Sequence, residues 1–131
     1  MNIKDFAEKI IYGYHEALEK GNTTPLKALE DPKVVYHLGA RGDFIGPDAH
    51  EKDFLTLRMV VSDARIDMKL LASDGNLLVF SLKQFYVFNG KLPGSPPAGT
   101  KTNIDSLCAF QLKNGKIIEM WLQGQSTSAN T

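Results

Sequence analysis

Apolar residues change their spacing about halfway along the chain. In the first half they recur every three or four residues, which is the spacing of an amphipathic helix, and from Ala64 onward they follow the pattern of β-strands. The first half predicts, in order, a helix over 2–21, a short helix over 24–29, a strand over 34–38 and a helix that begins at 46–48. Asn2 is placed to cap the first helix and Gly21 to end it.

The second half predicts four consecutive strands, over 64–72, 76–88, 99–112 and 116–123. Asn114-Gly115 between the last two is a strong β-hairpin signal. Along strand 99–112, Ile104, Cys108 and Phe110 share one face, and the other face also carries apolar residues. We therefore expect both faces of this sheet to be covered, and one of them could enclose a pocket.

Helices followed by a meander of strands predict an α+β domain, with N-terminal helices packed on a curved, mainly antiparallel sheet. We expect one domain over 1–125 and a flexible polar tail over 126–131. The segment 90–99 is rich in proline and glycine, and we expect a mobile loop that borders the mouth of any cavity.

Charge and cysteine content narrow the function classes. Fifteen basic and fifteen acidic residues give no net charge, so we expect neither nucleic acid nor a membrane surface as a partner. Cys108 is the single cysteine, which rules out an internal disulfide. The N-terminus lacks the core of a signal peptide, and we expect a cytoplasmic protein. The three histidines lack ligand-like spacing, so no metal site is expected.

Several motifs in this order resemble the nuclear transport factor 2-like superfamily of cone-shaped α+β domains. Gly46-Pro47-Asp48, the loop LPGSPPAGTK and the ending NGKIIEMW resemble SnoaL-like polyketide cyclases. Tyr14 in YHEALEKGN and the segment GTKT resemble ketosteroid isomerases. The resemblance implies a conical cavity between the helices and the concave face of the sheet, and a homodimer formed through the opposite face.

The resemblance also implies roles for particular residues. Tyr14 matches the tyrosine that stabilises an enolate in the isomerases, the position of the base falls at His37, and the position of a second acid falls at Cys108. Histidine can perform the proton transfer of a carboxylate at neutral pH, whereas a thiol is a weak hydrogen-bond donor. The cyclases place an aspartate shortly after the tryptophan, where this chain has LQGQ with Gln123 and Gln125.

Each of these residues also has a structural interpretation. Tyr14 lies on an apolar helix stripe, His37 could be a half-buried structural histidine, and Cys108 could be a small core residue. His50 is expected at the surface near the cavity mouth.

The sequence favours a small enzyme that performs proton-transfer chemistry (isomerisation, cyclisation or dehydration) on a hydrophobic carbonyl compound without a cofactor. Tyr14 and His37 would be catalytic and would point into one apolar cavity. The residues expected to bind the substrate are Phe54, Ser106, Cys108, Phe110, Met120 and Leu122. The alternative is a domain of the same fold that binds a small ligand or forms a dimeric interaction module without catalysis.

Overall fold

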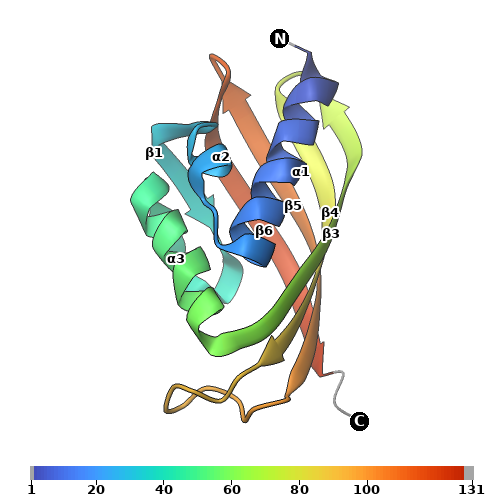
Figure 1. Ribbon diagram of the computed structural model, residues 1–131. Coiled ribbons are helices and arrows are strands. Elements are labelled where there is room, and N and C mark those ends of the chain that lie inside the picture. Colours follow the sequence, from blue (N-terminus) through green and yellow to red (C-terminus); the bar gives the residue numbers. More distant parts are fainter. Residues whose placement is uncertain (1, 129–131) are drawn as a thin grey trace.

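The computed structural model describes the backbone of residues 2–128 and the side chains of residues 2–124 (Figure 1). Its elements are, in chain order, α1 (Ile3–Lys20), α2 (Thr24–Lys27), β1 (Glu30–His37), the 3-10 turn η1 (Gly39–Arg41), β2 (Asp43–Ile45), α3 (Pro47–Val60), β3 (Val61–Asp74), β4 (Leu77–Phe88), β5 (Lys101–Lys113) and β6 (Lys116–Ser128). The predicted α+β fold, with helices first and a strand meander second, is confirmed.

Helix α1 begins and ends where its capping residues allow. The side chain of Asn2 accepts hydrogen bonds from the backbone N–H groups of Lys4 and Asp5, which would otherwise lack partners. Gly21 ends the helix at a φ of 75°, a conformation that favours glycine, and its N–H donates to the carbonyl of Ala17. The buried face of the helix carries large side chains, namely Phe6, Ile10, Tyr14 and Leu18.

In the described part of the chain the strands form one six-stranded sheet in the order β2-β1-β6-β5-β4-β3. Strand β1 pairs in parallel with β6, and the other neighbouring strands pair antiparallel. The sheet is curved, and α1 and α3 lie over the same face of it (Figure 1). This arrangement leaves space between the helices and the concave face.

The hairpin between β5 and β6 forms at the predicted place. Asn114 and Gly115 both have positive φ, of 53° and 74°, as a two-residue turn between twisted strands requires. Strand β6 is longer than predicted, because residues 126–128, expected in a flexible tail, pair with 102–104 of β5. Their polar composition gives no strand signal, since the pairing uses the backbone. The rest of the expected tail, 129–131, lies outside the described residues.

Two features near β1 differ from the sequence prediction. Strand β1 begins at Glu30, four residues before the predicted start, although Pro32 lies within it. Its register with β6 shifts between Glu30 and Val35, and a proline is tolerated at such an irregularity. Strand β2, which pairs with β1, was not predicted, because three residues are too few to show an alternating pattern.

The two faces of the sheet differ in how far their side chains are buried. On the inner face, β4 and β5 contribute buried side chains such as Leu78, Phe80 and Phe110. On the outer face, large apolar side chains are exposed, with Ile45 at 69%, Leu107 at 53% and Trp121 at 40%. The chemistry of a buried pocket therefore has to be sought on the inner face.

Candidate functional site

A cavity of about 470 Å³ lies between α1, α3, η1 and the inner face of the sheet. Its lining residues are Tyr14, Leu18, Leu38, Gly39, Ala40, Arg41, His50, Asp53, Phe54, Leu57, Leu82, Gln84, Tyr86, Ile104, Met120, Leu122, Gln123 and Gly124. The lining is mainly apolar, with a few polar groups. This size and composition are typical of sites for small organic molecules.

His50 is the most informative of the lining residues. It belongs to α3, is 3% exposed, and its Nδ1 lies 3.0 Å from Oε2 of Glu30 at the start of β1. In the neutral ring, Nδ1 therefore carries the hydrogen atom and donates a hydrogen bond to the carboxylate of Glu30. The lone pair of the ring is then on Nε2. None of the described residues forms a hydrogen bond with Nε2, so this atom is free for a molecule in the cavity.

Tyr36 supports the same carboxylate. Its hydroxyl donates a hydrogen bond to Oε2 of Glu30, and its ring stacks on His50 with 3.6 Å between ring centroids. Burial raises the pKa of Tyr36 well above the ordinary range of tyrosine, so its hydroxyl keeps its proton and remains a donor. The buried carboxylate of Glu30 thus accepts hydrogen bonds from two donors. These contacts fix both the orientation of the imidazole plane of His50 and its tautomer.

Tyr14 lines the same cavity and has a buried hydroxyl without a hydrogen-bond partner among the described residues. Its ring lies 6.1 Å from that of His50 and meets the rings of Phe54 and Phe110 edge to face. Burial, assisted by the acidic groups of Cys108, Glu30 and Asp53, raises the pKa of Tyr14 well above its usual value. The hydroxyl is therefore protonated and available to donate.

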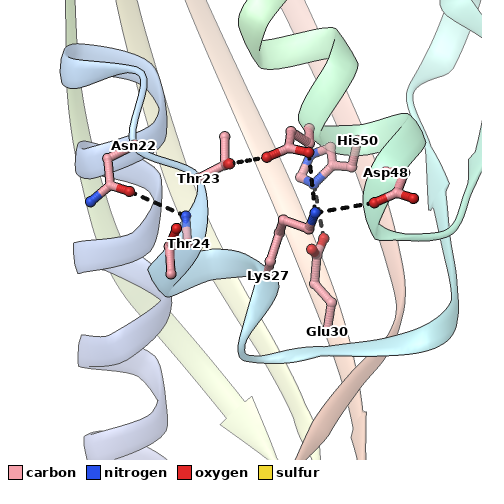
Figure 2. Close-up of polar contacts among 8 residues, drawn as sticks. Asn22, Thr23, Thr24, Lys27, Glu30, Asp48 and His50 are labelled. Carbon is pink, nitrogen blue, oxygen red and sulfur yellow. Dashed lines mark hydrogen bonds and ion pairs between the residues drawn. The ribbon is translucent and has the colours of Figure 1, made fainter.

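A polar network holds the N-terminal turn of α3, and hence His50, against the preceding chain (Figure 2). Lys27 of α2 binds Asp48 and Glu51, each at 3.1 Å, and the hydroxyl of Thr23 donates to Glu51. These contacts lower the pKa of Glu51, with the hydrogen bond from Thr23 as the largest cause. The network fixes the position of the helix that carries His50.

Other polar side chains line the cavity farther along the sheet. Arg41 of η1 forms an ion pair with Asp53 of α3 at 2.7 Å, and the hydroxyl of Tyr86 donates to Oε1 of Gln84. Gly124 completes this region. A Cβ at position 124 would lie 2.9 Å from the Cβ of Ser106, so no other residue fits there without a shift.

Comparisons with known proteins agree with the fold. The model of the SnoaL-like polyketide cyclase family matches residues 8–129. The chain belongs to this family. A search of curated proteins found no match to the sequence.

Solved structures share the fold of this SnoaL-like chain at low identity. IdmH from Streptomyces antibioticus superimposes with a TM-score of 0.73 at 19% identity, covering 91% of each chain. A type 2 hexachlorocyclohexane dehydrochlorinase, LinA, superimposes with a TM-score of 0.71 at 9% identity, covering 98% of this chain and 90% of its own. An LEH-like epoxide hydrolase of M. tuberculosis superimposes with a TM-score of 0.70 at 11% identity, covering 92% and 84%. At these identities the likeness concerns the fold alone.

The structure places the predicted site residues of the SnoaL-like chain in three groups. Those that line the cavity are Tyr14, Phe54, Met120 and Leu122. Those on the inner face but packed behind the lining are Ser106, Cys108 and Phe110. Ser106 donates to the carbonyl of Leu82, and burial raises the pKa of the Cys108 thiol to about 12, so this thiol is not ionised at neutral pH. The third group consists of His37 alone.

The expected position of His37 is wrong. Its side chain leaves β1 on the outer face, where its ring nitrogens contact Asp43 at 2.9 Å and Glu119 at 2.6 Å and its ring stacks on Trp121. His37 shares a face of β1 with Val35, and this face points away from the cavity, whereas Tyr36 points inward. His37 and Tyr14 therefore do not meet.

The expected position of His50 is also wrong, because it is buried in the cavity wall. A signal was present in the sequence, since His50, Phe54 and Leu57 are spaced by four and three residues and all three line the cavity. The partner Glu30 carried no comparable signal. Glu30 directly follows the predicted helix over 24–29, and no strand was predicted at this position.

Three smaller findings complete the description. None of the residues 90–99 lines the cavity, so the loop does not border it as expected. Within the described residues, no cluster of three or more His, Cys, Asp or Glu side chains could hold a metal ion. No helix in the described part of the chain is long and apolar enough to cross a membrane.

Proposed function

We propose that this SnoaL-like protein is an enzyme that moves a proton on a hydrophobic carbonyl compound, without a cofactor, and that His50 is its base. The proposal rests on one observation: His50, which pairs with the buried Glu30 and whose Nε2 has no hydrogen-bond partner among the described residues, lines the same cavity as Tyr14, whose buried hydroxyl also has none. Base, orienting carboxylate and hydrogen-bond donor are the parts that enolate chemistry requires.

The first chemical step follows from these positions. Nε2 of His50 takes a proton from the carbon next to the substrate carbonyl, so that the C–H bond breaks and an N–H bond forms. The electron pair of the C–H bond forms the carbon–carbon double bond of the enolate, the π pair of the carbonyl moves to its oxygen, and Tyr14 donates a hydrogen bond to this oxygen. Glu30 stabilises the imidazolium through Nδ1. Return of the proton to another carbon gives isomerisation. Where the substrate carries a β-hydroxyl group, the enolate expels it, and the proton held by His50 joins it to leave as water, which gives dehydration.

The relatives support a reaction of this general kind. The family is named for polyketide cyclases, and two structural neighbours are named as a dehydrochlorinase and an epoxide hydrolase. The apolar lining suits a substrate with a carbon skeleton of two or three rings.

The test uses a rigid three-ring aryl ketone, a tetrahydrophenanthrenone, as the probe. In deuterium oxide, the protein should accelerate exchange of the protons next to the ketone, followed by proton NMR. The His50→Gln variant should lose about a hundredfold or more of this acceleration, the usual scale for a lost acid–base group. The matched control is His37→Gln, which should keep the rate. Tight binding with no exchange would instead favour the non-catalytic, ligand-binding alternative.

We also propose a homodimer formed through the outer face of the sheet. Leu107 and Trp121 are exposed on the central strands β5 and β6, and Ile45 is exposed on β2. A second copy would cover these side chains with the same surface, as an isologous interface requires. Sedimentation should give twice the chain mass of 14.5 kDa, and Trp121→Lys should give the monomer. Sedimentation of the unaltered protein as a monomer would contradict the proposal.

A further inference from the structure

A second group of polar side chains lies inside the cavity, away from His50. On the inner face of β4, Leu78, Phe80, Leu82 and Gln84 follow one another at alternate positions. Leu78 pairs with Phe110, which pairs with Met120, and Met120 pairs with Tyr36, the residue stacked on His50. Gln84 therefore lies six residues along β4 from the row of paired residues that ends at Tyr36, on which the proposed base His50 stacks.

The amide of Gln84 has a fixed orientation. The hydroxyl of Tyr86, two residues along on the same face, donates a hydrogen bond to Oε1 of Gln84. Burial raises the pKa of Tyr86, so this hydroxyl keeps its proton and acts as the donor. The carbonyl oxygen of the amide thus already accepts a hydrogen bond. Among the residues that the structure describes, none accepts a hydrogen bond from its NH₂ group.

The charges nearby cancel each other. Arg41 and Asp53 also line the cavity and form an ion pair at 2.7 Å, with the guanidinium 5.8 Å from the ring centroid of Phe44. The paired charges leave this part of the cavity without net charge. An NH₂ donor in neutral, largely apolar surroundings favours an uncharged acceptor oxygen over a carboxylate, because an anion would lose its hydration without a free counter-charge.

We propose that Gln84 is a specificity-determining residue that binds an uncharged acceptor oxygen (carbonyl or ether) on the part of the substrate remote from the reacting carbon. This rests on the proposed function, since it assumes that the cavity holds the substrate. Tyr86 acts as a positioning residue, which keeps the amide turned so that its NH₂ faces the ligand. The substrate class is therefore an apolar ring compound with oxygen at both ends: a ketone at Tyr14 and an uncharged acceptor at Gln84.

The experiment compares two ligands of equal shape. Both are tetrahydrophenanthrenones, with either a methoxy or an ethyl group on the ring farthest from the ketone, and the dissociation constants are measured by calorimetry. The methoxy compound should bind about three- to tenfold more tightly, the scale of one neutral hydrogen bond. A carboxylate at the same place should not bind more tightly than methoxy. Equal affinity of the methoxy and ethyl compounds, or tighter binding of the carboxylate, would overturn the inference.

Variants then assign the preference to its residues. Gln84→Leu should reduce the methoxy-to-ethyl ratio to about one, whereas Gln111→Leu, the same change at a residue that does not line the cavity, should keep it. Tyr86→Phe should weaken binding of the methoxy compound more than binding of the ethyl compound and so reduce the ratio, whereas general damage to the cavity would weaken both ligands equally. An unchanged ratio in Gln84→Leu would contradict the role of this residue.

The same ligands separate this inference from the proposed function. Proton exchange next to the ketone depends on His50, and the methoxy preference depends on Gln84. Exchange that disappears in His50→Gln, together with a methoxy preference that persists in Gln84→Leu, would remove the specificity role and leave the proposed reaction intact. A methoxy preference that depends on Gln84, in a protein that catalyses no proton exchange, would leave the specificity role intact and contradict the proposed reaction.

Discussion

Two histidines of this protein each contact carboxylates, but they lie on opposite faces of the sheet. His50 is buried in the cavity wall and uses one ring nitrogen for Glu30, leaving the other free. His37 lies on the outer face with both nitrogens engaged, one by Asp43 and one by Glu119. A base needs a free lone pair, and only the first arrangement supplies one.

Burial adds to this difference. The Glu30–His50 contact is screened little by water, because their side chains are 1% and 4% exposed, so it fixes the ring firmly. The contacts of His37 are partly solvated, with Glu119 37% exposed, and such ion pairs contribute little to stability. The same residue types therefore give a candidate catalytic dyad in one place and a surface ion pair in the other.

The largest effect is expected from Glu30→Gln. The amide presents an NH₂ group as well as a carbonyl, so it no longer selects the tautomer of His50 with the proton on Nδ1. The exchange rate should fall by about ten-thousandfold, the scale of a wrong tautomer in a catalytic triad. Unfolding in urea should also show a loss of about 1–3 kcal/mol, for buried donors left without a full acceptor. Glu119→Gln on the outer face is the control and should change the rate less than twofold.

Tyr14→Phe should separate activity from stability. The exchange rate should fall by about a hundredfold, because one donor to the enolate oxygen is lost. The free energy of unfolding should stay the same or rise, because the hydroxyl has no partner in the folded protein. Tyr12→Phe, at an exposed position on the same helix, should leave the rate unchanged. A large loss of stability in Tyr14→Phe would show that the hydroxyl is bonded in solution and is not free for a ligand.

A smaller effect is expected from the network that holds α3. Lys27→Met removes the ion pairs with Asp48 and Glu51, and should lower the free energy of unfolding only slightly, because solvent screens pairs of exposed charges. The exchange rate should fall a few-fold, because His50 is less firmly positioned. Lys33→Met removes an exposed lysine of β1 and serves as the control. Equal effects of the two variants on the rate would contradict a positioning role for the network.

The smallest effect concerns the pH dependence contributed by His37. The hydrogen bond to Glu119, followed by that to Asp43, raises the pKa of His37 above its ordinary value. The stability that it contributes is therefore complete below about pH 6.5 and is lost as the pH rises through the higher folded-state pKa. The difference in unfolding free energy between the unaltered protein and His37→Gln should be largest at low pH and vanish at high pH. A difference independent of pH would contradict the charged pairing.

More of the fold than of the candidate site could be predicted from the sequence. The caps at Asn2 and Gly21 and the turn at Asn114-Gly115 are local signals, and the structure confirms each of them. The pairing of β1 with β6, more than eighty positions away in the sequence, determines on which face of the sheet His37 lies. The alternation of residues along β1 does not reveal this face. The pairing of Glu30 with His50 is likewise a contact between distant segments. The burial of Tyr14 could be predicted because the apolar stripe of its helix is a local signal, whereas its proposed role came from the resemblance to the ketosteroid isomerases.

The most direct test of the account is the tautomer of His50, read from the chemical shifts of the ring nitrogens in isotope-labelled protein. We expect the proton on Nδ1, an unprotonated Nε2, and a change at Nε2 when the three-ring ketone is added. In the same spectrum, His37 should show both nitrogens protonated below about pH 6.5 and no response to the ketone. A proton on Nε2 of His50, or a response to the ketone at His37 instead, would contradict the central claim.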